Sequence, residues 1–492
     1  MRRTAWLGIL GGAWLGLCAC GGSSPPDPGH GSTAAKPFLA ARVTPDPAPT
    51  PFDARAGGPY PGPLLSALTH EPWIRVRIRS AVTTATFAAP ADPTGAIRLS
   101  APAPAPGTSI AARTDSRGNS EGGGASGGGA ASGGGAGGPG YRYAGPLTLT
   151  RADGAWVIRD AAGRGVQWRR PHVALEAGTG GTLTLGDAQY PGRLVLTPRR
   201  DRAGRETGGF DVVNHVPIET YLPGVIEREL YARWPLETFK AQAVAARSYA
   251  LWEQTIAATR HYDLESTTAS QVYGGAASNP RALQAVRDTR GRVLAYRGRV
   301  VPAFFSSSTG GKGQDALAAF PRRVEDIAPL RAREHGAWDR ESPSYRWGPI
   351  TRDTATLSRR IAAWGGARKH PVARLGTLAA ARVAARNRVG RPTTLTLTDT
   401  AGRRFTLIAE AFRNACNFTQ DGRRPLDKPL TLLSSHVDVE VSGSTTRFTN
   451  GRGHGHGVGM SQWGAQAMGK AGHRYPAILG FYYPGARVVP AY

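Results

Sequence analysis

Glu227 and Glu229 are the first candidates for acid-base chemistry in this chain. Carboxylates two positions apart on a helix point to nearly opposite sides, so they do not form an acid/base pair. A single glutamate beside Tyr231 or Trp234 could have its pKa raised by desolvation and act as a proton donor. Spacing alone favours the alternative that Glu229 pairs with Arg233 one helical turn later.

The glycine-rich segment 451–465 is a second candidate, with glycine at every second position from 451 to 459. Missing side chains would let a ligand approach the backbone, and the same pattern suits a tight structural crossing. His454 and His456 would lie on one face of an extended segment, where they could chelate a metal or hydrogen-bond sugar hydroxyls. A zinc site needs a third ligand, and nothing in the sequence fixes one. We therefore assign no metal and no cofactor.

Two further segments, 270–275 and 303–311, combine hydroxyl and amide side chains with aromatic residues. Carbohydrate clefts use this combination because sugars offer many hydroxyls and flat apolar faces. Polar turns have the same composition. A serine hydrolase would need a Gly-x-Ser-x-Gly nucleophile elbow, which these serines do not form.

Helices should position the glutamates, because the strongest helical signals of the chain lie between residues 224 and 252. Pro235 suits the first position of a helix, so we expect a short helix before Trp234 and a longer one starting at Pro235. Small and apolar residues recur along the longer helix at helical spacing, which favours close packing. Further expected elements are a short helix at 281–287, strands at 293–296 and 300–306, and an insertion with helices near 350–390.

The preceding region, 63–190, is expected to be a β-rich, antiparallel domain. Residues 73–78 alternate apolar and charged side chains, as in a half-buried strand. A Gly/Ser-rich insertion at 118–140 interrupts this region. Further strand candidates, bounded by Gly and Asp turns, are 147–150, 155–158, 182–185 and 193–197.

The first residues predict export. Arg2 and Arg3 precede a short apolar stretch, and Cys20 follows it in a context that resembles a bacterial lipobox. Residues 1–20 are thus expected to be a lipoprotein signal peptide, and 21–62, rich in Pro and Gly, a tether. The expected location is the cell envelope, with a membrane anchor through Cys20. An ordinary signal peptide is the alternative. Cys18 and Cys20 both lie in this first segment, so Cys416 is the thiol that remains in the mature body, and it is expected to be a small buried hydrophobe.

The net charge of +26 predicts attraction to a polyanion. The basic residues are spread over the chain and no nucleic-acid motif appears, so we expect no nucleic-acid partner.

Taken in order, seven segments resemble the stage II sporulation protein D family (SpoIID/LytB domain), whose members include peptidoglycan lytic transglycosylases and amidase enhancers. The resemblance covers residues 191–492. It implies a mixed α+β catalytic domain. Together with the β-rich N-terminal region expected from the strand patterns, which the resemblance does not cover, this predicts an α+β fold class. The segments are 213–218, 221–229, 234–249, 270–275, 304–311, 453–465 and 482–485.

The resemblance places the catalytic glutamate of the family on Glu229. The implied reaction cleaves the β-1,4 bond between N-acetylmuramic acid and N-acetylglucosamine, leaving a 1,6-anhydro end. Glu229 would first protonate the leaving oxygen and then deprotonate the C6 hydroxyl. Ordinary glycosidases need a second carboxylate. Candidate substrate-binding residues are Gln242, Arg247, Ser270, Gln271, Tyr273, Ser307, Ser308, His454, His456, Ser461 and Gln462.

The chain departs from the family pattern at two positions. His454 stands where the family usually has an aromatic residue, and Leu230 where it often has methionine. The expected partner is a glycan strand, especially one stripped of stem peptides, whose free lactyl carboxylates form a polyanion. The alternative is a non-catalytic glycan-binding protein that enhances a cell-wall amidase.

Overall fold

The computed structural model describes residues 62–89, 96–102, 141–178, 180–419 and 428–492. They belong to one compact unit, Ala41–Tyr492. The predicted signal peptide with Cys20, residues 21–61 of the predicted tether and the insertion 118–140 lie outside the described residues. The described residues form a mixed α+β fold with a β-rich N-terminal region, which confirms the predicted class.

Two sheets make up the β-rich region. A seven-stranded sheet has the order β13-β1-β12-β11-β8-β3-β4, and a six-stranded sheet the order β10-β9-β2-β5-β6-β7. The first contains β1 (Trp73–Val82), β3 (Ala96–Ser100), β4 (Tyr141–Ala144), β8 (Val173–Glu176), β11 (Arg193–Arg200), β12 (Glu206–Pro217) and β13 (Leu264–Glu265). The second contains β2 (Thr84–Ala88), β5 (Leu147–Ala152), β6 (Ala155–Arg159), β7 (Gly165–Trp168), β9 (Thr182–Leu185) and β10 (Ala188–Pro191).

The five strands predicted in this region are all present, as β1, β5, β6, β9 and β11. All described pairings in the two sheets are antiparallel except that of β1 with β13. The rings of Trp156 on β6 and Phe210 on β12 meet edge to face at 5.1 Å between centroids. The aromatic contact therefore joins strands of different sheets in one buried core.

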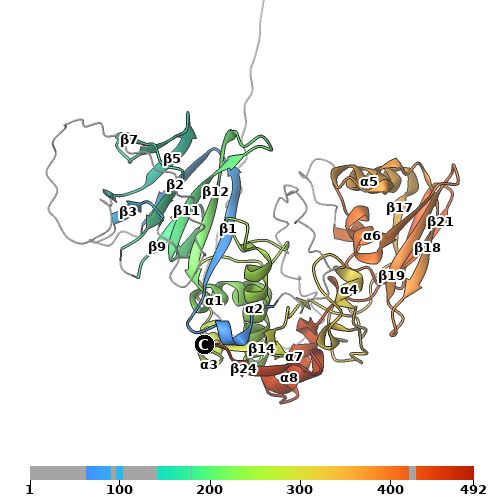
Figure 1. The fold of residues 1–492 in the computed structure, drawn as a ribbon. Coiled ribbons are helices and arrows are strands. Elements are labelled where there is room, and N and C mark those ends of the chain that lie inside the picture. Colours follow the sequence, from blue (N-terminus) through green and yellow to red (C-terminus); the bar gives the residue numbers. More distant parts are fainter. Residues whose placement is uncertain (1–61, 90–95, 103–140, 179, 420–427) are drawn as a thin grey trace, which may run out of the picture. The chain divides into compact units, whose positions relative to one another are not determined.

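The long strand β12 leads directly into helix α1 (Ile218–Glu229), beside β1 (Figure 1). Helix α2 (Leu236–Ile256) follows, so the predicted break at Pro235 is confirmed, with Pro235 as the residue before the first helical turn. Helix α1 begins earlier than the sequence indicated. Its first two backbone N–H groups have acceptors in the residues just before β1. Ile218 donates to the carbonyl oxygen of Pro72, and Glu219 donates to Glu71 Oε1.

Helix α2 is the centre of the mixed region. Phe239, Ala243, Ala246 and Ala250 are fully buried, as the predicted apolar stripe requires. The small side chains of the three alanines let neighbouring helices pack closely. These neighbours are α1, α3 (Pro280–Asp288), α7 (Gln462–Lys470) and α8 (Tyr475–Tyr482).

Short strands complete this region. β14 (Arg292–Tyr296) pairs with β15 (Arg299–Val300) and β24 (Arg487–Pro490), and β16 (Phe305–Ser306) pairs in parallel with β23 (Met460–Ser461). The strand predicted at 300–306 is therefore interrupted. Pro302 lies in the gap and has no N–H to donate to a ladder.

A second hydrophobic core lies between Ile350 and Phe448. The helical prediction for 350–390 holds for α5, but Leu378–Arg386 is strand β18, because pairing with β19 overrides the helix propensity of an Ala/Arg-rich sequence. Cys416 is buried there, as predicted, and its burial raises the pKa of the thiol to about 12. The elements are β17 (Ile350–Asp353), α5 (Thr354–Ala367), β18, β19 (Pro392–Asp399), β20 (Arg404–Ile408), α6 (Ala409–Cys416), β21 (Asp438–Ser442) and β22 (Thr445–Thr449).

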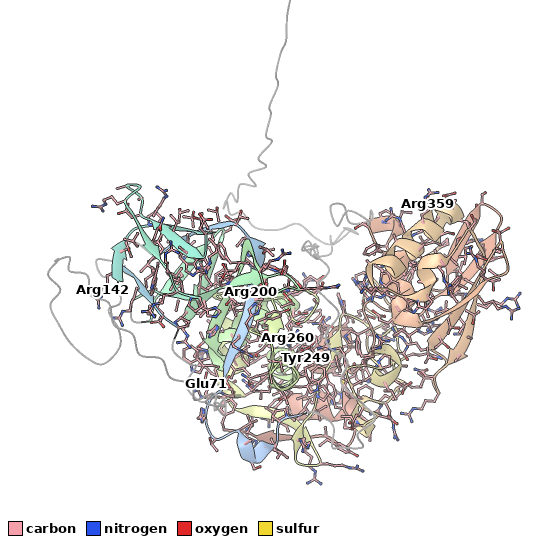
Figure 2. The ribbon with its side chains drawn as sticks, turned by 45° about the horizontal axis from the view of Figure 1, so that its top comes forward. Glu71, Arg142, Arg200, Tyr249, Arg260 and Arg359 are labelled. Carbon is pink, nitrogen blue, oxygen red and sulfur yellow. The ribbon has the colours of Figure 1, made fainter. Side chains whose placement is uncertain are left out.

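Exposed arginines are spread over many elements. Figure 2 shows Arg142 on β4, Arg200 on β11 and Arg359 on α5, all of them exposed. The positive charge is thus distributed, as the sequence predicted. Among the helices of the described residues, none has both the length and the apolar character that a bilayer crossing requires.

Gly224 on α1 offers a test of the packing between α1 and segment 270–275. A Cβ at this position would lie 2.0 Å from the carbonyl oxygen of Gly275. We expect Gly224→Ala to lower the free energy of unfolding by about 1–3 kcal/mol, because the backbone must move. Chemical denaturation measures this change. Gly480→Ala on α8 is the control, since its Cβ would meet nothing within 4 Å. Equal stability of the two variants would contradict the packing.

Candidate active site

Glu229 is the last residue of α1, and its side chain is partly exposed. The side-chain amide of Gln462, the first residue of α7, donates to Glu229 Oε2 at 2.9 Å. The backbone N–H of Val272 is a second donor to the carboxyl group. Three segments that are far apart in the sequence therefore meet at one carboxyl group.

The surroundings of Glu229 favour its neutral form. Burial raises the pKa of Glu229, while the hydrogen bonds from Gln462 and Val272 act in the opposite direction. The net result is a pKa above the ordinary range of a glutamate. A carboxyl group in this condition can donate a proton and then hold the resulting negative charge, because two donors are already aimed at it.

The surface ion pair favoured by spacing alone is absent from the described residues. No ion pair there joins Glu229 to Arg233, whose guanidinium lies 6.0 Å from the ring centroid of Tyr231. Glu227 points elsewhere, as helix geometry predicted, and accepts hydrogen bonds from the backbone of Ser278 at 2.8 Å. The two glutamates have separate partners, and only Glu229 contacts the other candidate segments.

Aromatic side chains cluster immediately after Glu229. The ring centroids of Tyr231, Trp234 and Trp463 are 5.2 to 5.9 Å apart. Trp463 follows Gln462 in the sequence, whereas Tyr231 and Trp234 lie in the connection after α1. The cluster therefore joins that connection to the start of α7, next to the Gln462–Glu229 hydrogen bond. Tyr231 and Trp463 remain partly exposed, whereas Trp234 is buried.

Segment 270–275 packs over α1 and α2. Gln271 accepts a hydrogen bond from the Tyr221 hydroxyl at 2.9 Å and donates to the Ala246 carbonyl at 3.2 Å. The hydroxyl of Tyr273 donates to Asn214 at 2.9 Å. Gln271 and Tyr273 are buried, so they hold Val272 against Glu229, while Ser270 is partly exposed and accepts from the backbone of Glu265.

The glycine-rich segment crosses other parts of the protein itself. A Cβ at Gly457 would lie 2.1 Å from the Arg391 guanidinium, and one at Gly459 would lie 2.1 Å from the Phe304 carbonyl oxygen. Both residues also have positive φ angles. The interpretation as a tight structural crossing therefore fits these contacts, because protein atoms occupy the space that the missing side chains leave.

Both candidate histidines in this segment are partly exposed and favour the neutral form. Desolvation lowers the pKa of His454 and of His456 to about 4. His456 Nδ1 accepts from the Val458 N–H at 3.0 Å, and its ring packs against Phe304 and Phe320. Within the residues described, no three His, Cys, Asp or Glu side chains are grouped as metal ligands.

Asp339, which the sequence did not single out, organises the serine-rich segment. Its buried carboxylate joins that segment to the start of α7. Because Ser461 also accepts from Gly464 N–H as the N-cap of α7, Asp339 fixes the helix end that presents Gln462. The donors to Asp339 are Ser308 Oγ (2.8 Å), Thr309 N (2.7 Å), Thr309 Oγ1 (3.2 Å), Gly310 N (3.0 Å), Gly311 N (3.1 Å) and Ser461 Oγ (3.0 Å).

Arg391, another residue missed from the sequence, provides a second buried anchor. It lies between β18 and β19, and its guanidinium donates to the carbonyl groups of Lys312 and His456, both at 3.1 Å. Burial lowers the pKa of Arg391 to about 10. No sequence signal marks Asp339 or Arg391, because their importance comes from contacts with distant loops.

Several candidate residues are enclosed. Ser308 is fully buried on Asp339, while Ser307 is partly exposed and its carbonyl accepts from Trp463 N–H at 3.1 Å. Arg247 is fully buried and pairs with Glu219 at the other end of α1, so no part of its side chain is open to a ligand.

Gln242 on α2 is fully buried, and neither atom of its amide has a hydrogen-bond partner among the described residues. One turn earlier, Thr238 donates to the Ala465 carbonyl on α7, and one turn later the Ala246 carbonyl accepts from Gln271. Gln242 therefore lies on the face of α2 between the two segments that donate to Glu229.

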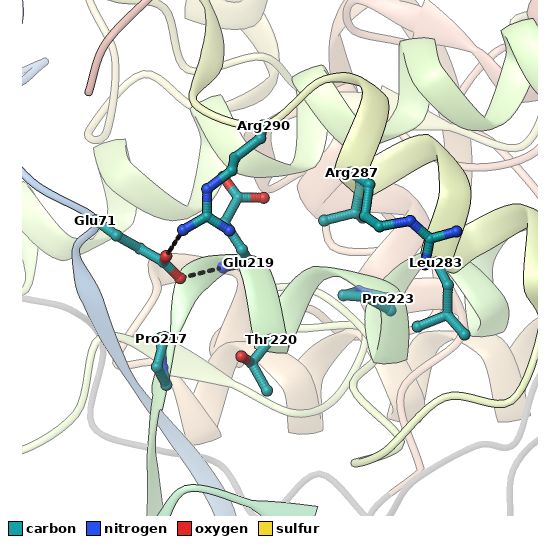
Figure 3. Close-up of a pocket in the computed structure, with 9 residues that line it drawn as sticks. Glu71, Pro217, Glu219, Thr220, Pro223, Leu283, Arg287 and Arg290 are labelled. Atoms are coloured by element: carbon teal, nitrogen blue, oxygen red, sulfur yellow. Dashed lines mark hydrogen bonds and ion pairs between the residues drawn. The ribbon is translucent and has the colours of Figure 1, made fainter. Parts of the chain in front are cut away.

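A cavity of about 350 Å³ lies near the opposite end of α1, lined by Glu71, Glu219 and Arg290 among others (Figure 3). Its carboxylates are already paired, Glu71 with Arg290 and Glu219 with Arg247. Ten residues of helix separate Glu219 from Glu229, or about 15 Å. This cavity is therefore distinct from the Glu229 site.

Residues 206–296 match the family model SpoIID, described as Stage II sporulation protein. This segment contains β12, α1, α2 and β14, and thus Glu229 and its donor Val272. The resemblance to the stage II sporulation protein D family is confirmed.

Three relatives extend the similarity. The chain is 29% identical over 313 residues to an uncharacterised protein of Brachyspira hyodysenteriae, covering 62% of this chain and 74% of that protein. It is 27% identical over 295 residues to stage II sporulation protein D of Bacillus subtilis, covering 57% and 76%. It is also 30% identical over 291 residues to the amidase enhancer of Bacillus subtilis, covering 54% of this chain but only 39% of that protein.

Asp339→Asn tests the buried anchor of the site. The amide would place N–H groups against N–H donors, so we expect the free energy of unfolding to fall by about 3 kcal/mol or more. Chemical denaturation gives the value. Asp326→Asn is the control, because this half-exposed carboxylate pairs with exposed Arg331, and its loss should cost at most about 1 kcal/mol. A change at Asp339 no larger than the control would refute the anchoring role.

Proposed function

We propose that this protein acts on the bacterial cell wall as a lytic transglycosylase of peptidoglycan glycan strands, with Glu229 as its acid and base. The observation that carries the proposal is a desolvated, partly exposed carboxyl group held by two donors beside an aromatic cluster. The names of the relatives, a sporulation protein and an amidase enhancer, support a role in cell-wall remodelling.

The chemistry follows from the raised pKa of Glu229. Glu229 in its protonated form donates to the glycosidic oxygen, and the C1–O bond breaks as positive charge develops at the anomeric carbon. The carboxylate that remains is stabilised by Gln462 and the Val272 N–H. It then takes the proton of the C6 hydroxyl as that oxygen bonds to C1, which closes the 1,6-anhydro ring and restores the acid.

One carboxyl group suffices for this sequence of steps. Retaining and inverting glycosidases need a second carboxylate near the first, to attack the sugar or to activate water. Glu227 is bound to the backbone of Ser278 and Asn279, on another side of α1. The intramolecular hydroxyl takes the place of water.

Substrate contacts belong to the partly exposed residues around Glu229. Tyr231 and Trp463 offer aromatic surface to a sugar face, and the partly exposed residues Ser307, His454 and Ser270 of the other candidate segments offer polar groups. Buried neighbours hold these groups in place through their own hydrogen bonds; they are Gln271, Tyr273, Ser308 and Ser461. Attachment to a membrane through Cys20, in the cell envelope, belongs to the same proposal.

The second candidate is a non-catalytic enhancer of a cell-wall amidase. The similarity to the amidase enhancer of Bacillus subtilis favours it, although the chain covers 39% of that protein. Enhancement would require glycan binding but not proton transfer by Glu229.

Glu229→Gln separates these candidates. We expect the wild type to release anhydromuramic products from purified denuded glycan, and the variant to lose at least about a hundredfold in rate, because one group performs both proton transfers. Mass spectrometry of the products measures this, with and without chelator. Absence of anhydro products from the wild type would contradict the transglycosylase proposal. Loss of activity with chelator alone would favour a metal-dependent hydrolase.

The pH dependence provides a separate test. Gln462 donates to the carboxylate form of Glu229, so its removal raises the pKa of Glu229 further. Since the first step needs protonated Glu229, the alkaline limb of kcat against pH should move to higher pH in Gln462→Leu. Gln466→Leu, one turn later on α7, should keep the wild-type profile. A limb that stays in place in Gln462→Leu would contradict this assignment.

A further inference from the structure

A second cavity, of about 410 Å³, lies where the second hydrophobic core joins the glycine-rich segment. It is lined by Arg346, Trp347, Arg447 and Arg452, together with neighbouring backbone. Arg346 and Trp347 lie just before β17, and Arg447 lies on β22. The antiparallel pairing of β17 with β22 thus brings the three arginines together.

The three guanidinium groups have no acidic or side-chain partner in the part of the chain that the structure describes. Among the residues described, none forms an ion pair with Arg346, Arg447 or Arg452, and no side chain accepts a hydrogen bond from them. Asp438, a carboxylate close to Asn450 on the cavity lining, already bonds Asn450 at 3.0 Å and pairs with Arg386 at 3.4 Å. Glu440 lies opposite Arg447 in the pairing of β21 with β22, but no ion pair joins these two described residues. The cluster therefore keeps a net positive charge, which favours the binding of an anion.

The aromatic part of this cavity is rigid. The indole of Trp347 donates to the Gly453 carbonyl at 2.9 Å, and its backbone N–H donates to the Gly451 carbonyl at 2.8 Å. The ring lies so close to Gly451 that a Cβ there would be 2.2 Å from it. A fixed indole beside guanidinium groups can contact the apolar face of a sugar while arginine binds its acid group.

The cavity is also connected to the Glu229 site. Arg452 and Gln462 belong to one continuous segment, ten residues apart, which spans at most about 35 Å. The backbone of His454, two residues after Arg452, bonds to Ser308 at 2.8 Å. A glycan strand is long enough to reach both places.

We propose that Arg346, Arg447, Arg452 and Trp347 form a binding site for an acidic sugar of the glycan strand, with the guanidinium groups on its carboxylate. This inference rests on the proposed function, because the strand that fills the site is the one that Glu229 cuts. The site raises the affinity for strands with free carboxylates and takes no part in proton transfer.

Binding is measured on proteins that also carry Glu229→Gln, so that nothing is cut. The probes are denuded glycan and the same glycan with its carboxylates amidated. We expect Arg346→Gln/Arg447→Gln/Arg452→Gln to raise the Kd for denuded glycan about tenfold at low salt. The matched control is Arg359→Gln/Arg382→Gln/Arg404→Gln, which removes the same charge from exposed positions on α5, β18 and β20. This control should change the Kd less than twofold.

Amidation of the glycan should weaken binding by the parent protein and abolish the difference between parent and cavity variant. An unchanged Kd in the cavity variant, or an equal loss in the control, would overturn the site. Arginine-dependent binding of poly(glycerol phosphate) without such binding of glycan would also overturn it. If protein with native Glu229 cuts no glycan while binding still depends on the arginines, the proposed reaction fails and the site stands.

Discussion

The structure of the candidate site depends on one desolvated carboxyl group and the donors that reach it. Burial makes the charged form of Glu229 costly, and Gln462 and Val272 reduce that cost without removing it. The end of a helix, where carbonyl groups point outward, is also a poor place for negative charge. A group in this balance can exchange a proton in both directions, which is the property that a single-carboxylate mechanism needs.

The protonation balance of Glu229 depends on a hydrogen bond between residues 233 positions apart in the chain, so Gln462 must be held within hydrogen-bond distance of Glu229. Two buried charged side chains hold the segments around the site in place. Asp339 binds the loop around Ser308 and the N-terminal end of α7, and Arg391 binds the glycine-rich segment through carbonyl groups. Both charges face polar backbone groups, so breaking either network would leave an unpaired charge inside the protein. The region around the second hydrophobic core thus supports the site, because Arg391 lies in the connection between its strands β18 and β19.

The predictable part of the molecule is local. Alternation located β1, proline located the start of α2, and small apolar residues marked the buried face of that helix. Glu229 needed the order of the family segments, since spacing alone favoured a surface ion pair. Asp339 and Arg391 could not be found, because their roles arise from long-range contacts. Strand β18 was missed because its Ala/Arg composition favours a helix until β19 pairs with it.

The central claim is that Glu229 performs both proton transfers and that the C6 hydroxyl, rather than water, attacks the anomeric carbon. Digestion of denuded glycan in water enriched in oxygen-18 tests it most directly. The account predicts muramic ends that are 1,6-anhydro and contain no oxygen-18. Reducing ends that carry one oxygen-18 atom from the start of the reaction would show hydrolysis and contradict the account.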